Sequence, residues 1–136
     1  MPGHKKLHNF KFRVAYSDTD QMGVMHHSNY LRYFEMARHD LFREMGVSYA
    51  EIEANGVIMP VIQANLEYKK PVFYDQVINI ETHIMLNKGP RIVFSASMIN
   101  ESKEVVCTSR ISLAYVNKVS RKACFPPAII KSKLII

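Results

Sequence analysis

The stretch 16–35, YSDTDQMGVMHHSNYLRYFE, combines side chains that could do chemistry. Asp18 and Asp20 stand one residue apart, and a glycine and two adjacent histidines, His26 and His27, follow them. The run after the histidines has helical periodicity, so these residues should connect an earlier element to the start of a helix. A metal site, a catalytic site and a polar connecting turn are the three roles to weigh.

A metal site fits this stretch poorly. The side chains of adjacent residues such as His26 and His27 are expected to point in different directions. A metal ion would also need a third and a fourth ligand at a suitable spacing, and the sequence offers none there. The sequence therefore predicts no metal here.

A catalytic role fits better. The N-terminus of a helix presents unpaired backbone N–H groups and a partial positive charge, which can stabilise an oxygen that gains negative charge. Gly23 permits a tight turn, and Asp20 stands seven residues before His27. A carboxylate that faces such an oxyanion donor is an arrangement suited to acyl transfer.

The same residues also have structural interpretations. Asp18 is expected to cap the turn through the local backbone, and Asp20 is equally suited to forming a turn and to acting as a catalytic carboxylate. Ser28 or Asn29 is expected to cap the following helix.

One long helix is predicted by apolar residues at three- and four-residue spacing, namely Tyr30, Phe34, Ala37, Leu41 and Met45. Gly46 is placed to end it, and a short second helix fits residues 49–55. Glu35 lies on the long helix, either as a buried partner of Arg38 or Arg32 or as a second catalytic acid.

Alternation with period two predicts five strands, at 10–16, 62–68, 78–86, 92–98 and 105–115. The alternation places Leu86, Val105 and Cys107 on buried faces. The last three strands are joined by short connections and should form an antiparallel meander. The order of elements predicts an α+β domain with one long helix against one face of a five-stranded antiparallel sheet.

Length and composition predict one ordinary domain. The chain has 136 residues, of which 48% are hydrophobic and 22% are charged. No apolar run resembles a signal peptide or a membrane span, so a cytoplasmic location is expected. Cys107 and Cys124 lack ligand spacing and should be inert thiols.

The net charge of +6 comes from the two ends of the chain. Residues 1–13 carry four basic side chains and residues 118–136 carry five, with no acid in either segment. The middle, 14–117, has nine basic and twelve acidic residues, a net charge of −3. This distribution does not suit a broad nucleic-acid-binding face. It suits solvated tails, or contact with a local anionic ligand.

Two segments carry a family resemblance: YSDTDQMGVMHHSNYLRYFEMAR and, further on, YKKPVFYDQVINIET. They resemble the hotdog-fold acyl-CoA thioesterases of the 4-hydroxybenzoyl-CoA thioesterase class, most closely the tol-pal-associated branch. The resemblance runs from about Phe12 to Asn117. It implies a single hotdog domain over 1–136, with a core of about 10–117 and a basic tail at 118–136. It also implies a sheet wrapped around the helix and subunits joined sheet edge to sheet edge, as homodimers or as homotetramers that are dimers of dimers.

The resemblance also implies roles for two positions. Asp20 matches the catalytic carboxylate, and His27 stands where the family has its backbone oxyanion donor, with an imidazole that matches the histidine of the closer branch. Met25-His26 replaces a common valine-tyrosine pair, and Gln21-Met22 stands where small residues are frequent, so the acyl pocket is expected to differ in shape. The carboxylate at Asp20 argues against the polyketide-releasing branch, which lacks it.

The sequence thus predicts an enzyme that hydrolyses acyl-CoA, with Asp20 as nucleophile or general base and no cofactor, because thiolate is a good leaving group. Lys88 and Arg91, in the turn NKGPR, are candidate contacts for the CoA phosphates. An acyl carrier protein thioesterase, a hotdog hydratase and a non-catalytic acyl-CoA binding module are the alternatives. The preferred acyl group is left open.

Overall fold

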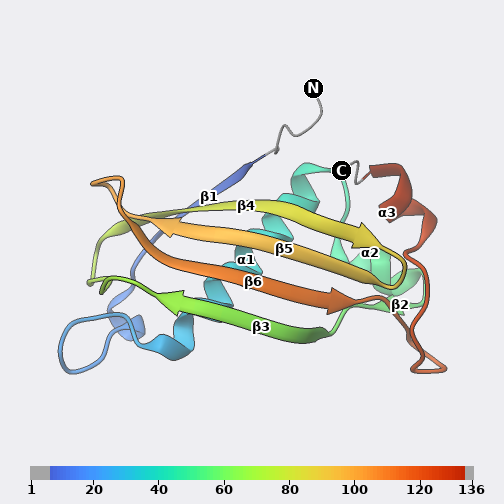
Figure 1. Cartoon of the computed structure of the whole chain (residues 1–136), viewed down its shortest axis with the longest axis horizontal. Helices are drawn as coiled ribbons and strands as arrows, with labels where there is room; N and C mark the ends of the chain where they lie inside the picture. Colours follow the sequence, from blue (N-terminus) through green and yellow to red (C-terminus); the bar gives the residue numbers. More distant parts are fainter. Residues whose placement is uncertain (1–6, 134–136) are drawn as a thin grey trace.

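Residues 7–133 are described by the computed structural model, in which five strands form one antiparallel sheet of order β1-β4-β5-β6-β3 (Figure 1). The strands are β1 (His8–Arg13), β3 (Val61–Tyr68), β4 (Val77–Lys88), β5 (Arg91–Ile99) and β6 (Val105–Ala114). The helices are α1 (Tyr30–Glu44), α2 (Tyr49–Ala54) and α3 (Ala128–Lys133), with single 3₁₀ turns η1 (Tyr16–Asp18) and η2 (His27–Asn29). Strands β2 (Val57–Ile58) and β7 (Val116–Asn117) form a separate two-stranded sheet.

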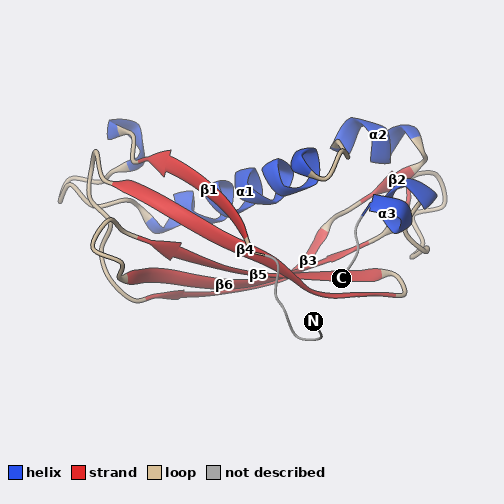
Figure 2. Ribbon diagram, turned by 90° about the horizontal axis from the view of Figure 1, so that it is seen from above, coloured by secondary structure: helices blue, strands red, loops and turns tan. Residues whose placement is uncertain are grey.

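Helix α1 lies along one face of the curved sheet, as Figure 2 shows. Its apolar stripe faces the sheet, and the chain leaves the helix at Gly46, whose φ of +85° is a left-handed conformation that glycine adopts without strain. The predicted α+β architecture with a central helix is confirmed.

Within residues 7–133, no helix is both long and apolar enough to cross a membrane.

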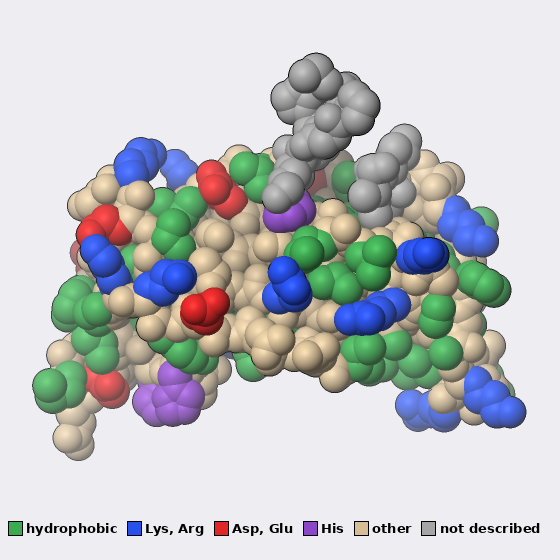
Figure 3. Space-filling model, viewed as in Figure 1, with side chains coloured by type: hydrophobic (Ala, Val, Ile, Leu, Met, Phe, Trp, Pro, Cys, Tyr) green, Lys and Arg blue, Asp and Glu red, His purple; other side chains and the backbone are tan. Residues whose placement is uncertain are grey.

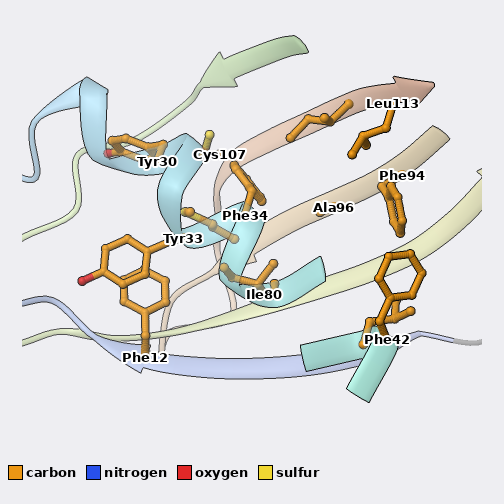
Figure 4. Close-up of a cluster of buried hydrophobic side chains, with 14 of the residues drawn as sticks. Phe12, Tyr30, Tyr33, Phe34, Phe42, Ile80, Phe94, Ala96, Cys107 and Leu113 are labelled. Carbon is orange, nitrogen blue, oxygen red and sulfur yellow. The ribbon is translucent and has the colours of Figure 1, made fainter. Parts of the chain in front are cut away.

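The core lies between α1 and the sheet (Figure 4). Phe34 and Phe42 of the helix are fully buried, and Phe42 meets Phe94 of β5 edge to face. Phe12 of β1 stacks on Tyr33 with ring centroids 3.7 Å apart, which fixes the first strand to the start of the helix. Cys107 is buried here, and burial raises the pKa of its thiol to about 12. Both cysteines are free thiols, as predicted.

Two of the three register shifts in the sheet place residues that were predicted to be buried on an exposed side. Ile84 pairs with Phe94 but Leu86 pairs with Val93, so Met85 is an extra residue and Leu86 is 38% exposed. A second irregularity, opposite the end of β5, leaves Val105 exposed as well. An inserted residue reverses the faces of the residues beyond it, so the prediction that Leu86 and Val105 are buried was wrong.

Strand β3 is an edge strand with no covering layer of its own. Ala64 and Tyr68 are paired with the buried residues Ile111 and Cys107 of β6, so the even-numbered side chains from Ala64 to Tyr68 share the face of the sheet that carries α1. Ile62 lies at a register shift between Val61 and Gln63 and has no partner on β6. Every residue of β3 is nevertheless exposed or only half-buried. The sheet therefore has an apolar strip along this edge that the chain itself does not bury.

The end of the chain is partly folded onto the core, contrary to the expectation of a solvated tail. Ile130 of α3 is fully buried, and Ile129 packs against the core cluster. The amine of Lys133 lies close to Gly46, next to the end of α1. Apolar positions within the basic segment, and not its charge, decide where it lies.

Shortening Ile130 should destabilise the fold. We expect Ile130→Ala to lower the unfolding free energy by about 2–4 kcal/mol, because the change leaves a cavity in a packed site. Phe125→Ala is the matched control, since Phe125 is 71% exposed and its loss should change stability by less than about 0.5 kcal/mol. Urea denaturation checks both, and equal stability of the two variants would contradict the docking of α3.

Candidate active site

A small hairpin holds Asp20. Thr19 bridges to Met25, the Asp20 N–H donates to the Val24 carbonyl at 2.9 Å, and Gly23 turns the chain with φ +78°. The Oδ1 atom of Asp20 accepts the Met22 N–H at 2.8 Å and the Val24 N–H at 3.4 Å. Its Oδ2 atom has no hydrogen-bond partner among the described residues. The carboxylate is exposed and does form the turn, as one of its two predicted roles required.

The backbone N–H of His27 is the unengaged donor at the start of the helical segment. The N–H groups around it are bonded: that of His26 to the Asp18 carbonyl at 2.8 Å, that of Ser28 to His26 Nδ1 at 3.2 Å, and that of Asn29 to the His26 carbonyl at 3.0 Å. For the His27 N–H, residues 7–133 supply no acceptor. Since η2 leads directly into α1, this donor lies at the positive end of the helix dipole.

A cavity of about 280 Å³ opens beside His27. Its lining comes from Met25, His27 and Tyr30 on one side and from 68–71 on the other. Tyr30 and Tyr68 meet edge to face with ring centroids 4.9 Å apart, and the Tyr68 hydroxyl donates a long bond of 3.5 Å to the His27 carbonyl. Burial raises the pKa of Tyr30 to about 12 and also raises that of Tyr68, so both hydroxyls stay protonated at neutral pH.

Sequence reasoning missed this second wall of the cavity. Tyr68, Lys69 and Lys70 stand about forty residues after His27, and only the pairing of β3 with β6 brings them to it. The segment YKKP was noted as part of the family resemblance, but nothing in its spacing indicated contact with the helix start. Lys69 and Lys70 also line the cavity, where the Lys70 amine is paired with Glu104 and the Lys69 amine lies 4.0 Å from Glu67.

The other predicted site residues lie elsewhere in the single chain. Asp20 is on the same loop as His27 but does not line the cavity. Lys88 and Arg91 face each other across the β4–β5 turn. In Figure 1 that turn is at the opposite end of the sheet from the loop 19–29. One chain therefore brings together His27, the two tyrosines and the two lysines, and leaves the Lys88–Arg91 pair apart.

The two adjacent histidines lie against each other, although they were expected to diverge. The ring centroids of His26 and His27 are 4.2 Å apart, with the rings tilted by 33°. The Nδ1 atom of His26 is engaged with Ser28, through the hydroxyl at 2.8 Å and the N–H. His26 thus caps the 3₁₀ turn, a role that had been assigned to Ser28 or Asn29 for the helix. This expectation about the histidines was wrong because the short turn folds both rings to one side.

Asp18 is a buried anchor and does more than cap a turn. It is 4% exposed, and its carboxylate accepts bonds from Arg32 at 2.5 Å, from the Tyr33 hydroxyl, and from the Ala15 N–H at 3.2 Å. Burial and then the hydrogen bond to Asp18 raise the pKa of Tyr33, so its hydroxyl remains a donor. The Asp18 carbonyl also accepts the Asn29 side-chain amide at 2.9 Å. Asp18 therefore fastens the loop to α1.

Glu35 takes a structural position in the chain. Its carboxylate is exposed and lies 4.0 Å from a guanidinium nitrogen of Arg38. The buried member of this pair is Arg38, at 4% exposure, and burial lowers the pKa of its guanidinium. The predicted pairing of Glu35 with Arg38 is confirmed, but the expectation that Glu35 is buried was wrong, because Arg38 is the member of the pair that packs inside.

Asp18→Asn should destabilise the protein, whereas turn capping alone would have made it harmless. We expect a loss of about 1–3 kcal/mol, because the amide cannot accept all three bonds and leaves Tyr33 and Arg32 poorly paired. The ion pair with Arg32 contributes only a small part of this loss, because Arg32 is half exposed and solvent screens the pair. Asp75→Asn, at an exposed turn position with φ +72° that asparagine tolerates, is the matched control. Thermal unfolding that is equal for both variants would contradict the anchoring role.

Comparison with known proteins gives consistent matches along nearly the whole chain. Residues 14–134 match the model of the Thioesterase-like superfamily. The acyl-CoA thioesterase YbgC of Helicobacter pylori is 32% identical over 130 residues, which are 90% of this chain and 96% of that protein. The acyl-CoA thioester hydrolase YbgC of Escherichia coli is 29% identical over 126 residues, 93% of this chain and 92% of that protein.

A solved structure agrees with these matches. The DHNA-CoA thioesterase of Staphylococcus aureus has a TM-score of 0.83 and 32% sequence identity, and the match covers 88% of this chain and 80% of that chain. The matches confirm the prediction of a hydrolase of the thioesterase class with a hotdog fold. The chain belongs to the Thioesterase-like superfamily.

Proposed function

We propose that this protein hydrolyses acyl-CoA thioesters to the free acid and CoA, with the thioester carbonyl bound at the start of η2. The observation that carries the proposal is the His27 N–H, which has no acceptor within 7–133 and borders the cavity. A thioester oxygen placed there would accept this N–H, and the helix dipole would stabilise its negative charge as the carbonyl is attacked.

Asp20 is the proposed carboxylate of the reaction. The Met22 and Val24 N–H groups hold its Oδ1 atom, which leaves Oδ2 for chemistry. Either Oδ2 attacks the carbonyl, and water then hydrolyses the mixed anhydride, or Oδ2 removes a proton from the attacking water. In both routes the C–S bond breaks, the thiolate of CoA leaves and takes up a proton, and the acid is released. The His27 imidazole would orient the water or the substrate.

The proposed assembly is a two-fold dimer joined through the β3 edges, which can pair again into a tetramer. The unburied apolar strip of β3, with Ile62, Leu66 and Tyr68, supports this arrangement, because an exposed apolar edge strand is normally covered. The edge is β3 and not β5 or β6, which are central in the sheet despite their long apolar faces.

This dimer would give Lys88 and Arg91 their proposed place at the CoA phosphates. Antiparallel pairing of two β3 strands puts Val61 of one copy near Tyr68 of the other. Within each chain the Val61 end of the sheet is also the Arg91 end, two strands away, or roughly 10 Å. The partner's Lys88 and Arg91 would then approach the cavity from the side. In Figure 3, the end of the sheet that carries this turn shows Lys and Arg without acidic side chains between them.

The finer assignments are part of the same proposal. They are the 4-hydroxybenzoyl-CoA thioesterase class, its tol-pal-associated branch, and a cytoplasmic location. Acyl carrier protein is the alternative carrier of the thioester. A hydratase would add water to an enoyl-CoA without releasing thiol, and a binding module would retain acyl-CoA without turnover. A thiol-release assay over short, long and aromatic acyl-CoAs therefore identifies a thioesterase, and an enoyl-CoA hydration assay separates a hydratase from a binding module.

Asp20→Asn should lower the turnover number by about two to four orders of magnitude, since the amide can neither attack nor take a proton. His27→Ala should cause a smaller loss, because the backbone N–H stays in place. Thiol release measures the rates, and thermal unfolding checks that each variant is folded. A folded Asp20→Asn protein with near-native turnover would refute the mechanism.

Ile62→Lys should convert the assembly to monomers. Ile62 is 56% exposed in the single chain, so lysine there is tolerated by the fold but would place a charge in the apolar strip that the dimer buries. Val119→Lys, at a fully exposed turn, is the control and should leave the mass unchanged. Light scattering at micromolar concentration measures the mass, and a monomeric unmodified protein would rule out the dimer. If the partner's Lys88 and Arg91 contact CoA, the KM for acyl-CoA should rise on dissociation.

A further inference from the structure

Three potential metal ligands meet on the side of α1 that faces β1, away from the cavity. His8 begins β1, and Asp40 and Glu44 lie one turn apart on α1. The Nε2 atom of His8 is 2.9 Å from Asp40 Oδ2 and 2.9 Å from Glu44 Oε2. All three ligand atoms lie within 4.8 Å of one another, and within residues 7–133 this is the one group of at least three such ligands.

The contacts of His8 converge on this point. The imidazole is buried, with its side chain 6% exposed, whereas Asp40 is partly exposed and Glu44 is mostly exposed. Its Nδ1 atom has no hydrogen-bond partner among the described residues, so the two carboxylates are the polar groups that face the ring. The Arg43 guanidinium lies 4.0 Å from the other oxygen of Asp40. A buried nitrogen from a strand is thus aimed between two carboxylates from a helix.

One proton on Nε2 serves this arrangement poorly. An imidazole N–H points along a single direction in the ring plane and makes one good hydrogen bond, yet two carboxylate oxygens stand at the same distance from it. The two acids also repel each other. A divalent cation has the charge to neutralise both, and it accepts ligands from several directions at once.

We propose that His8 Nε2, Asp40 and Glu44 form a binding site for a divalent transition-metal ion, with Zn²⁺ as the preferred ion. Zinc takes imidazole nitrogen and carboxylate oxygen at about 2.0–2.2 Å, so neighbouring ligand atoms of a tetrahedral zinc site lie about 3.3–3.6 Å apart. The distances of 2.9 Å from His8 Nε2 to both oxygens are about 0.4–0.7 Å shorter than this, so the two carboxylates, which are both at least partly exposed, would move outward slightly to admit the ion. Water would complete the coordination on the exposed side. Imidazole is a ligand that suits Zn²⁺ better than Mn²⁺, which favours Zn²⁺ at a site with a buried imidazole.

The role of this site would be to join β1 to α1. The ion would link the first residue of the sheet's β1 edge to the second half of the helix, on the opposite side of α1 from the strip along β3. It touches none of the residues proposed for thioester hydrolysis. The bound ion should therefore raise the stability of the fold and leave the chemical step to Asp20 and His27.

Zinc titration of the full-length chain, after removal of metal with a chelator, tests the proposal. Calorimetry should show one Zn²⁺ per chain, and Co²⁺ should give visible absorption bands as a spectroscopic substitute. At a hundredfold excess over Kd, Zn²⁺ should raise the Tm by roughly 5–10 °C. Absence of binding to Zn²⁺, Co²⁺ and Mn²⁺ at millimolar concentration would overturn the proposal.

Glu44→Gln is the decisive variant, because Glu44 is mostly exposed and its change should not affect folding. It should weaken Zn²⁺ binding by at least the roughly tenfold that loss of a supporting contact costs a metal site. His8→Gln should do the same if it folds. His83→Gln, which removes an imidazole elsewhere on the sheet, is the matched control and should bind as the unmodified chain does.

Zinc bound at His26 and His27 would give a different pattern. In that case His26→Gln would lose the ion and Glu44→Gln would keep it, and the proposed site would be refuted. Loss of binding in Glu44→Gln together with full binding in His26→Gln and His83→Gln would establish it. Neither result depends on thioesterase activity, so the metal site and the proposed function can fail separately.

Discussion

The candidate site depends on one buried carboxylate. Asp18 holds Arg32 and Tyr33 of α1 with its side chain, and its carbonyl holds the His26 N–H and the Asn29 amide. These bonds fasten the loop to the first turn of the helix before any substrate is present. They also satisfy the His26 N–H, and the neighbouring His27 N–H has no acceptor in the described chain. A donor fixed in this way needs no rearrangement when charge develops on a bound oxygen, which is the condition under which such donors are most effective.

The second constraint is the order of the strands. With β3 at the edge, the residues that complete the cavity, Tyr68 to Pro71, stand at the end of a strand whose apolar face has no cover. The proposed dimer explains both facts through one contact. It would bury the strip, and its two-fold axis would turn the partner's Lys88 and Arg91 toward a cavity from which they are remote within one chain. In the proposed dimer, each chain would supply its own catalytic groups, and the substrate would be bound by residues of both chains.

Periodicity predicted the helix, the meander and the fold class because each of those elements has one buried face. It failed at Leu86, where an extra residue in β4 changes the face without leaving a mark in the pattern. Asp18 was misjudged because its partner Tyr33 lies fifteen residues away, whereas turn capping is a local pattern. The contact of Tyr68 with His27 was missed for the same reason, since these two residues lie still further apart in the sequence. Ile130 shows that a basic segment can still be held by one apolar side chain.

Asp20 can form a turn and act as the proposed catalytic carboxylate at the same time. Turn former and catalytic carboxylate were opposed as interpretations of the sequence, but the geometry makes them compatible. Two backbone N–H groups bind Oδ1 and limit the rotation of the side chain, so Oδ2 is presented in a restricted set of directions. A carboxylate that must approach a thioester carbon reacts faster when its side chain is already restricted in this way, because less rotational entropy is then lost in reaching the transition state. The hairpin 19–25 would therefore do for the proposed catalytic carboxylate what Asp18 does for the proposed oxyanion donor.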